Sequence, residues 1–164
     1  MNLKKIITTL SFLLILSCGY EPIYSKKNIN NNYNFSIKTI NFSGDNKVNK
    51  ILKNKFIKYL NKESKSTELN LNLNSKVEKS VRSKNKKGNP IGFSIKIMIN
   101  LKVFESKILK GETNFERNFE YNNKSIKFDL LQYEKNIKGN LTSELSNEII
   151  NYLNYLKWYL KHLK

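Results

Sequence analysis

The chain has few of the side chains on which most enzymes and metal sites depend. Its 164 residues include one cysteine and one histidine. A single cysteine excludes an internal disulfide, so the fold has to rest on its hydrophobic core. The sequence also contains no nucleophile elbow, no phosphate-binding glycine loop and no HExxH zinc motif. We therefore predict a binding or structural protein, with no enzymatic activity, no cofactor and no metal site.

Alanine is missing altogether, and acidic residues are few. Lysine and arginine number 30 against 13 for aspartate and glutamate, which gives a formal net charge of +17. Abundant Asn, Lys and Ile without alanine is typical of an AT-rich genome, so codon bias explains part of this charge. Such a charge predicts attraction to phosphate groups, either of nucleic acid or of lipid.

Residues 1–17 have the layout of an export signal. Two lysines precede an apolar run over 6–16, which is shorter than the roughly 20 residues that span a bilayer. Cys18 follows the small residue Ser17 directly, as in bacterial lipoproteins, where this thiol receives a diacylglycerol. We predict a lipoprotein signal peptide at 1–17 and a lipid-anchored tether at 18–34. The alternative is a secretory signal beside an incidental cysteine.

Lipidation of Cys18 would also determine where the protein resides. Gly19 follows the cysteine, whereas aspartate at this position usually signals retention in the inner membrane. Each buried methylene contributes about 0.8 kcal/mol, and the two or three acyl chains of a lipoprotein give stable anchoring. The predicted location is the outer membrane, on its periplasmic side.

The remaining residues, 35–164, are predicted to form one domain. Apolar residues alternate over 35–42 with a slip near Thr39, which predicts an irregular strand. Asp45 can cap a following helix, which the apolar spacing extends over about four turns to Leu60.

Three further strands and a long helix complete the predicted domain. Alternation over 69–77, 93–103 and 115–121 indicates the strands, with Gly111 ending a short turn before the last one. An apolar stripe at steps of three and four predicts a final helix from about Ile126 or Asp129. The order β-α-β-β-β-α predicts an α+β fold, with two helices on one face of a four-stranded, mainly antiparallel sheet.

Three short segments resemble a known family. Leu16–Tyr24 reads Leu-Ser-Cys-Gly-Tyr-Glu-Pro-Ile-Tyr, similar to the mature start of the lipopolysaccharide-assembly lipoprotein LptE of alphaproteobacteria, although Ile23 replaces the usual leucine. The segment 88–93 resembles the family's second hairpin, and 119–122 its joint to the last helix. The resemblance implies an outer-membrane lipoprotein that sits as a plug in an LptD-type β-barrel and assists lipopolysaccharide transport to the outer leaflet without covalent chemistry.

A cluster of cations could bind the lipopolysaccharide. In an antiparallel meander, the turn after the second strand and the joint before the last helix lie at the same end of the sheet. The candidate residues there are Arg82, Lys84, Lys86, Lys87, Lys124 and Lys127. The resemblance places a basic lipopolysaccharide-binding residue of the family at Lys86 or Lys87. The alternative is that these are solvated side chains of a lysine-rich protein.

Two other functions are compatible with the composition. One is a generic outer-membrane lipoprotein adaptor, which binds another envelope protein through the polar sheet face or the tail around Trp158. The other is a nucleic-acid-binding module, which needs aromatic side chains on the exposed sheet face. Phe93 shares the aliphatic face of its strand and only Phe104 points the other way, so we expect no nucleic-acid partner.

Overall fold

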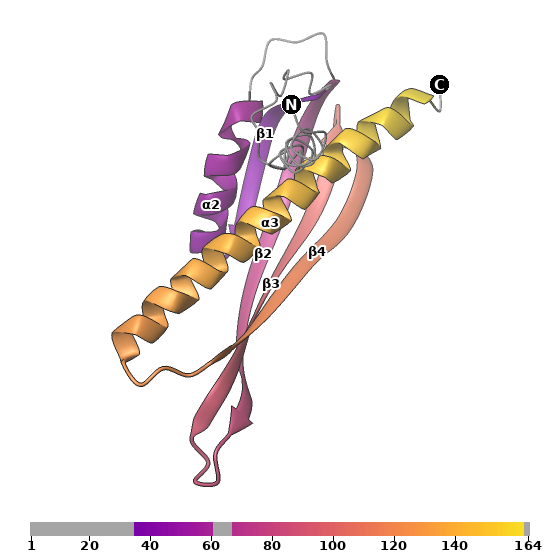
Figure 1. Cartoon of the computed structure of the whole chain (residues 1–164). Coiled ribbons are helices and arrows are strands. Elements are labelled where there is room, and N and C mark those ends of the chain that lie inside the picture. Colours follow the sequence, from indigo (N-terminus) through magenta and orange to yellow (C-terminus); the bar gives the residue numbers. More distant parts are fainter. Residues whose placement is uncertain (1–34, 61–66, 163–164) are drawn as a thin grey trace, which may run out of the picture. The chain divides into compact units, whose positions relative to one another are not determined.

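The computed structural model describes residues 35–60 and 67–162. Its elements are β1 (Phe35–Gly44), α2 (Asn46–Phe56), the 3-10 helix η2 (Ile57–Tyr59), β2 (Thr67–Lys84), β3 (Pro90–Glu105), β4 (Ile108–Asn122) and α3 (Lys127–His162) (Figure 1). The predicted α+β class and element order are confirmed. The predicted signal peptide, Cys18 and the tether lie outside the described residues.

The four strands form one mixed sheet in the order β1-β2-β3-β4. β1 pairs in parallel with β2, while β2, β3 and β4 form an antiparallel meander. The register of β1 shifts between Ile37 and Thr39, which confirms the irregularity predicted from the slipped alternation. The sheet is therefore mainly antiparallel, as predicted.

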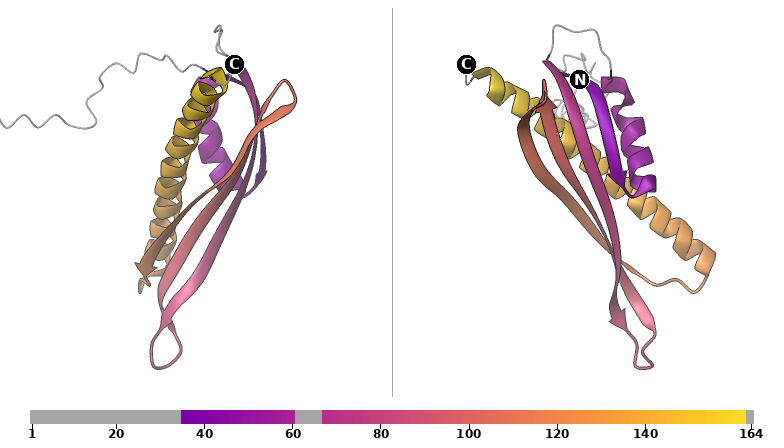
Figure 2. Two further views of the ribbon diagram at one scale, coloured as in Figure 1. Left: turned by 90° about the vertical axis from the view of Figure 1, so that its right-hand side faces the viewer. Right: turned by 180° about the vertical axis from the view of Figure 1, so that it is seen from behind.

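Both helices cover the same face of the sheet, so a single core fills the space between the two layers (Figure 2). Along β3, the odd-numbered residues from Phe93 to Val103 are buried and the intervening ones are partly exposed. α3 contributes a buried stripe that includes Ile137, Leu145 and Leu153. The strict alternation and the helical stripe thus identified the core correctly.

α2 begins directly after Asp45, the capping residue that the sequence predicted. The Asp45 carboxylate accepts hydrogen bonds from the backbone N–H groups of Lys47 and Val48, both at 2.9 Å. It satisfies donors that the first turn of a helix leaves without a partner. The α-helix ends at Phe56, and one 3-10 turn continues it to Tyr59.

The turn before β4 lies earlier than predicted. Ser106 and Lys107 form it with positive φ angles of 47° and 73°, whereas Gly111 lies within β4. A Cβ atom at Gly111 would come within 2.4 Å of the Tyr152 hydroxyl oxygen. Gly111 was therefore wrongly assigned to the turn, and its lack of a side chain lets α3 approach the strand.

Candidate functional site

The β2–β3 hairpin carries two of the predicted cations at its tip. The Asn85 side chain accepts hydrogen bonds from the backbone N–H groups of Lys87 and Asn89, both at 2.9 Å. Gly88 adopts a φ of 82°, which costs glycine little. These contacts order the turn, so the exposed side chains of Lys86 and Lys87 project from a defined backbone.

The prediction that residues 82–88 form one turn is wrong. β2 continues past Val77 to Lys84, because it remains paired with β3 beyond the end of its apolar alternation. Arg82 is the extra residue of a β-bulge between Val81 and Ser83. Arg82 and Lys84 therefore lie on the stem of the hairpin, and the turn itself comprises only residues 85–89.

The strand–helix joint meets the base of this hairpin, as the meander argument predicted. The Asn123 backbone N–H donates to the carbonyl of Ile91, and its side-chain amide donates to the carbonyl of Pro90, both at 2.9 Å. β4 ends opposite Gly92, however, so the hairpin extends beyond it. The joint and the turn share one end of the sheet, but at different distances along the hairpin.

The six candidate cations consequently differ in their surroundings. Arg82 forms an ion pair with Glu120 on β4, and the Lys124 ammonium lies 4.3 Å from the centroid of the Tyr133 ring. Within residues 35–60 and 67–162, the exposed ammonium groups of Lys84, Lys86, Lys87 and Lys127 form no ion pair. The cations with no ion pair at the hairpin end are the ones best able to bind a ligand phosphate.

A hollow of about 460 Å³ lies at the base of the hairpin. Its lining residues are Arg82, Ser83, Gly92, Phe93, Glu120, Tyr121, Asn122 and Tyr133. The Phe93 and Tyr121 rings stack with centroids 5.7 Å apart, and Tyr133 meets Tyr121 edge-on at 5.9 Å. Aromatic side chains and the Arg82–Glu120 ion pair thus both line the hollow.

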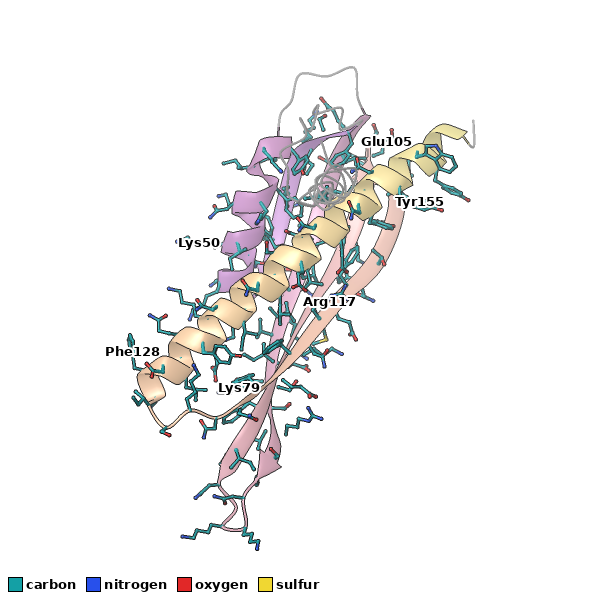
Figure 3. The ribbon with its side chains drawn as sticks, in the orientation of Figure 1. Lys50, Lys79, Glu105, Arg117, Phe128 and Tyr155 are labelled. Carbon is teal, nitrogen blue, oxygen red and sulfur yellow. The ribbon has the colours of Figure 1, made fainter. Side chains whose placement is uncertain are left out.

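Next to these aromatic side chains lies an ion pair whose carboxylate is buried and whose lysine is partly exposed. Glu134 on α3 is 6% exposed, and its Oε1 accepts hydrogen bonds from the Lys79 ammonium at 2.6 Å and the Tyr121 hydroxyl at 2.8 Å. The Lys79 ammonium also lies 4.4 Å from the centroid of the Phe93 ring. The group ties β2, β4 and α3 together next to the hollow (Lys79 is labelled in Figure 3).

The two acidic members of this group titrate abnormally. Burial opposes ionisation of the Glu134 carboxyl, but hydrogen bonds from Lys79 and Tyr121, with the charge of Lys79, outweigh it and lower its pKa. Burial raises the pKa of the Tyr121 hydroxyl, and its bond to Glu134 adds to that shift. At neutral pH, Glu134 is therefore an ionised acceptor and Tyr121 a neutral donor.

Sequence reasoning missed Lys79, Tyr121 and Glu134 as a group, although their signals are present. Lys79 continues the odd-numbered, core-facing positions of β2, and Glu134 lies within the apolar stripe of α3 between Leu130 and Ile137. Charged residues at core positions are rarely buried without a partner. Lys79 and Glu134 carry opposite charges at core-facing positions, so the sequence alone was sufficient to suggest that they pair.

Neither a spanning helix nor a metal site occurs in the described part of the chain. No helix there is long and apolar enough to cross a membrane. No three His, Cys, Asp or Glu side chains among these residues gather to hold a metal ion.

No protein-family model and no curated protein matches the sequence. Solved structures are similar in fold. Rare lipoprotein B from Shewanella oneidensis superposes with a TM-score of 0.50 at 10% identity, over 70% of this chain and 96% of that one. A minor lipoprotein from Acinetobacter baumannii gives 0.53 at 8% identity, over 72% and 91%. An uncharacterized lipoprotein B from Nitrosomonas europaea gives 0.51 at 11% identity, over 78% and 88%. The chain therefore has a fold that these bacterial lipoproteins share.

Proposed function

We propose that the protein is an outer-membrane lipoprotein of the LptE type. It is anchored through Cys18 on the periplasmic side, forms a plug-and-barrel complex with an LptD-type β-barrel and assists lipopolysaccharide assembly in the outer leaflet. The observation that carries the proposal is the combination of a lipoprotein-like Cys18 with a fold that solved structures named as rare, minor or uncharacterized lipoproteins also have.

The outer face of the sheet suits a barrel lumen. It carries ion pairs between Lys96 and Glu116 at 2.8 Å and between Lys102 and Glu112 at 3.2 Å, and Asn100 donates to Asn114 at 2.9 Å. The interiors of outer-membrane barrels are polar, so a polar plug surface matches them better than an apolar one would. This face is where we expect the barrel wall to contact the domain.

The hairpin suits a phosphorylated glycolipid. Lys84, Lys86 and Lys87 present ammonium groups that bind phosphate as point charges, without the forked geometry of arginine. We expect this end to bind and orient the lipopolysaccharide without forming a covalent bond to it.

A mild-detergent pull-down of the tagged full-length protein from native membranes tests the assignment. We expect mass spectrometry to identify an outer-membrane β-barrel as prey and acyl mass on Cys18 of the bait. An acylated bait that retains a different envelope protein and no barrel would support the adaptor function instead. An unmodified, soluble bait would refute the anchor itself.

The hairpin is tested by charge removal with a matched control. Lys86→Gln with Lys87→Gln should weaken binding of purified lipopolysaccharide about fivefold per lysine. Lys50→Gln with Lys53→Gln removes the same charge from the exposed face of α2 and should leave binding nearly unchanged. Equal losses in both variants would mean that only overall charge matters.

A further inference from the structure

Exposed apolar side chains from three segments lie at the end of the domain opposite the basic hairpin. We call this the apolar end. Its members are between 46% and 63% exposed and comprise Ile57, Ile108, Leu109, Tyr155, Trp158 and Tyr159. They come from three separate segments, namely η2, the start of β4 and the last turns of α3.

Several contacts place these segments at one end. Gly111, near the start of β4, lies against Tyr152 and Leu156 of α3. α2 runs back along β1, and Leu60 after η2 bridges to Ile37 near the start of that strand. In Figure 1 the basic hairpin is at the bottom and the end of α3 is at the top, where Figure 3 labels Tyr155. Since β2 has 18 residues, the two ends are about 60 Å apart.

The three aromatic side chains form a stacked group on one helix surface. The Tyr155 ring lies 6.4 Å from Trp158 and 6.4 Å from Tyr159, with interplanar angles of 27° and 20°. Tyrosine and tryptophan combine an apolar ring with a polar group, and both are enriched where a membrane meets water. This chemistry fits a lipid headgroup region better than bulk water.

Lysines accompany the apolar residues of the two other segments. Lys58 follows Ile57, and Lys107 precedes Ile108 in the exposed turn before β4. Lys110 also lies there, but its ammonium pairs with Glu105 at 3.4 Å. A lysine next to an exposed apolar side chain can keep its ammonium among anionic headgroups while its methylenes lie deeper.

We propose that the apolar end docks on the headgroup region of an anionic phospholipid bilayer, the same bilayer to which Cys18 tethers the chain. The inference rests on the lipoprotein part of the proposed function and not on the barrel or on lipopolysaccharide. The described domain begins at Phe35, whose strand pairs with the start of β2 at the apolar end. Residues 18–34 would reach at most about 60 Å even when fully extended. The attachment point and the docking surface therefore share one end of the domain.

Docking would fix the orientation of the domain relative to the membrane, which a lipid tether alone does not do. Before a barrel encloses the domain, a tethered domain can rotate freely above the membrane, whereas a docked one points β2, and with it Lys86 and Lys87, away from the bilayer. The basic hairpin would then be held about 60 Å from the headgroups. This orientation prevents the cationic tip from binding the phosphates of its own membrane.

The position of the single tryptophan makes the proposal directly measurable. Trp158 is the only tryptophan in the chain, so intrinsic emission reports on the apolar end alone. The full-length acylated protein is reconstituted into phosphatidylethanolamine–phosphatidylglycerol vesicles containing lipids brominated at known depths. We expect a blue shift of the Trp158 emission and quenching that is strongest for bromines nearest the headgroups. Unshifted, unquenched emission from the acylated protein would overturn docking while leaving the lipid anchor intact.

Two matched double variants distinguish docking through the apolar end from nonspecific adsorption of exposed apolar side chains. Tyr155→Ser with Tyr159→Ser removes two exposed rings from the apolar end and should raise the ratio of undocked to docked protein about tenfold. Phe128→Ser with Leu131→Ser removes two side chains that are at least as exposed on average, from the other end of α3, and should leave quenching unchanged. Equal effects of the two pairs would overturn the proposal. If Cys18 carries no acyl mass, the same vesicles are added to the unacylated chain, and quenching or its absence decides docking independently of the anchor.

Discussion

Removing Lys79 should destabilise the protein far more than removing a lysine of the outer sheet face. Lys79→Met leaves the carboxylate of Glu134, which is 6% exposed, with only the Tyr121 hydroxyl as a partner. Loss of one partner from a buried ion pair typically costs about 3–5 kcal/mol. Because 38% of the Lys79 side chain is exposed, solvent screens the pair, and we expect about 3 kcal/mol.

Removing the other partner, Glu134, should cost less stability than removing Lys79. Glu134→Leu leaves the Lys79 ammonium able to reach water, so its principal cost is the buried Tyr121 hydroxyl that loses its acceptor, about 1–3 kcal/mol. Combining Lys79→Met with Glu134→Leu removes both charges, so the double variant should be more stable than Lys79→Met alone. This order of stabilities follows from the different burial of the two partners.

Urea unfolding followed by circular dichroism measures these differences as shifts in midpoint at constant slope. Lys96→Met is the matched control, since Lys96 pairs with Glu116 at 2.8 Å on the exposed face and is likewise 38% exposed. An exposed pair of this kind contributes about 0–1 kcal/mol. If Lys79→Met costs no more than Lys96→Met, then Glu134 is not held as a buried charge and the reasoning is wrong.

The same group predicts a dependence of stability on pH. The folded-state pKa of Glu134 lies below its ordinary value of 4.5. Its contribution is therefore complete above about pH 4.5 and is lost as the pH falls through the folded-state pKa. Unfolding midpoints between pH 7 and pH 3 should decline less steeply in Glu134→Gln than in the natural protein. Parallel profiles would contradict the assignment.

Substitutions at Gly44, Gly88, Gly139 and Asp45 test the fold further. Gly44→Ala should destabilise the protein by more than 3 kcal/mol, because φ is 91° and a Cβ would lie 1.8 Å from the Ser75 carbonyl oxygen. Its control, Gly88→Ala, should cost only about 1–2 kcal/mol, because φ is 82° but the space around the residue is open. Similar unfolding midpoints of the two variants would argue against the close approach of β1 and β2. Gly139→Ala should stabilise α3 by about 0.5–1 kcal/mol, since nothing lies within 4 Å of the added methyl, and a lower melting temperature would contradict this. Asp45→Ala should cost about 1 kcal/mol in urea unfolding through loss of the α2 cap, while Asp45→Asn should retain most of it.

Local patterns in the sequence were sufficient for most of the fold. The alternation from Phe93 to Val103 identified β3 and its buried face, and steps of three and four identified α3. Asp45 identified the start of α2. These features are set within a few residues of the chain, because side-chain periodicity decides which face of an element can be buried. The sequence also located the cations of the hairpin and of the joint, and indicated that both lie at one end.

Only the tertiary structure decided how that end is built. β2 continues to Lys84 through pairing with β3, although its own residues beyond Val77 lose the apolar alternation. Lys79 and Glu134 lie 55 residues apart in sequence, and only the packing of α3 on the sheet brings their charges together. Long-range pairing likewise places Arg82 against Glu120 and leaves Lys86 and Lys87 at the tip. Charges on different elements acquire partners only when the elements pack, and for this reason the sequence named the cations but not which of them would be neutralised.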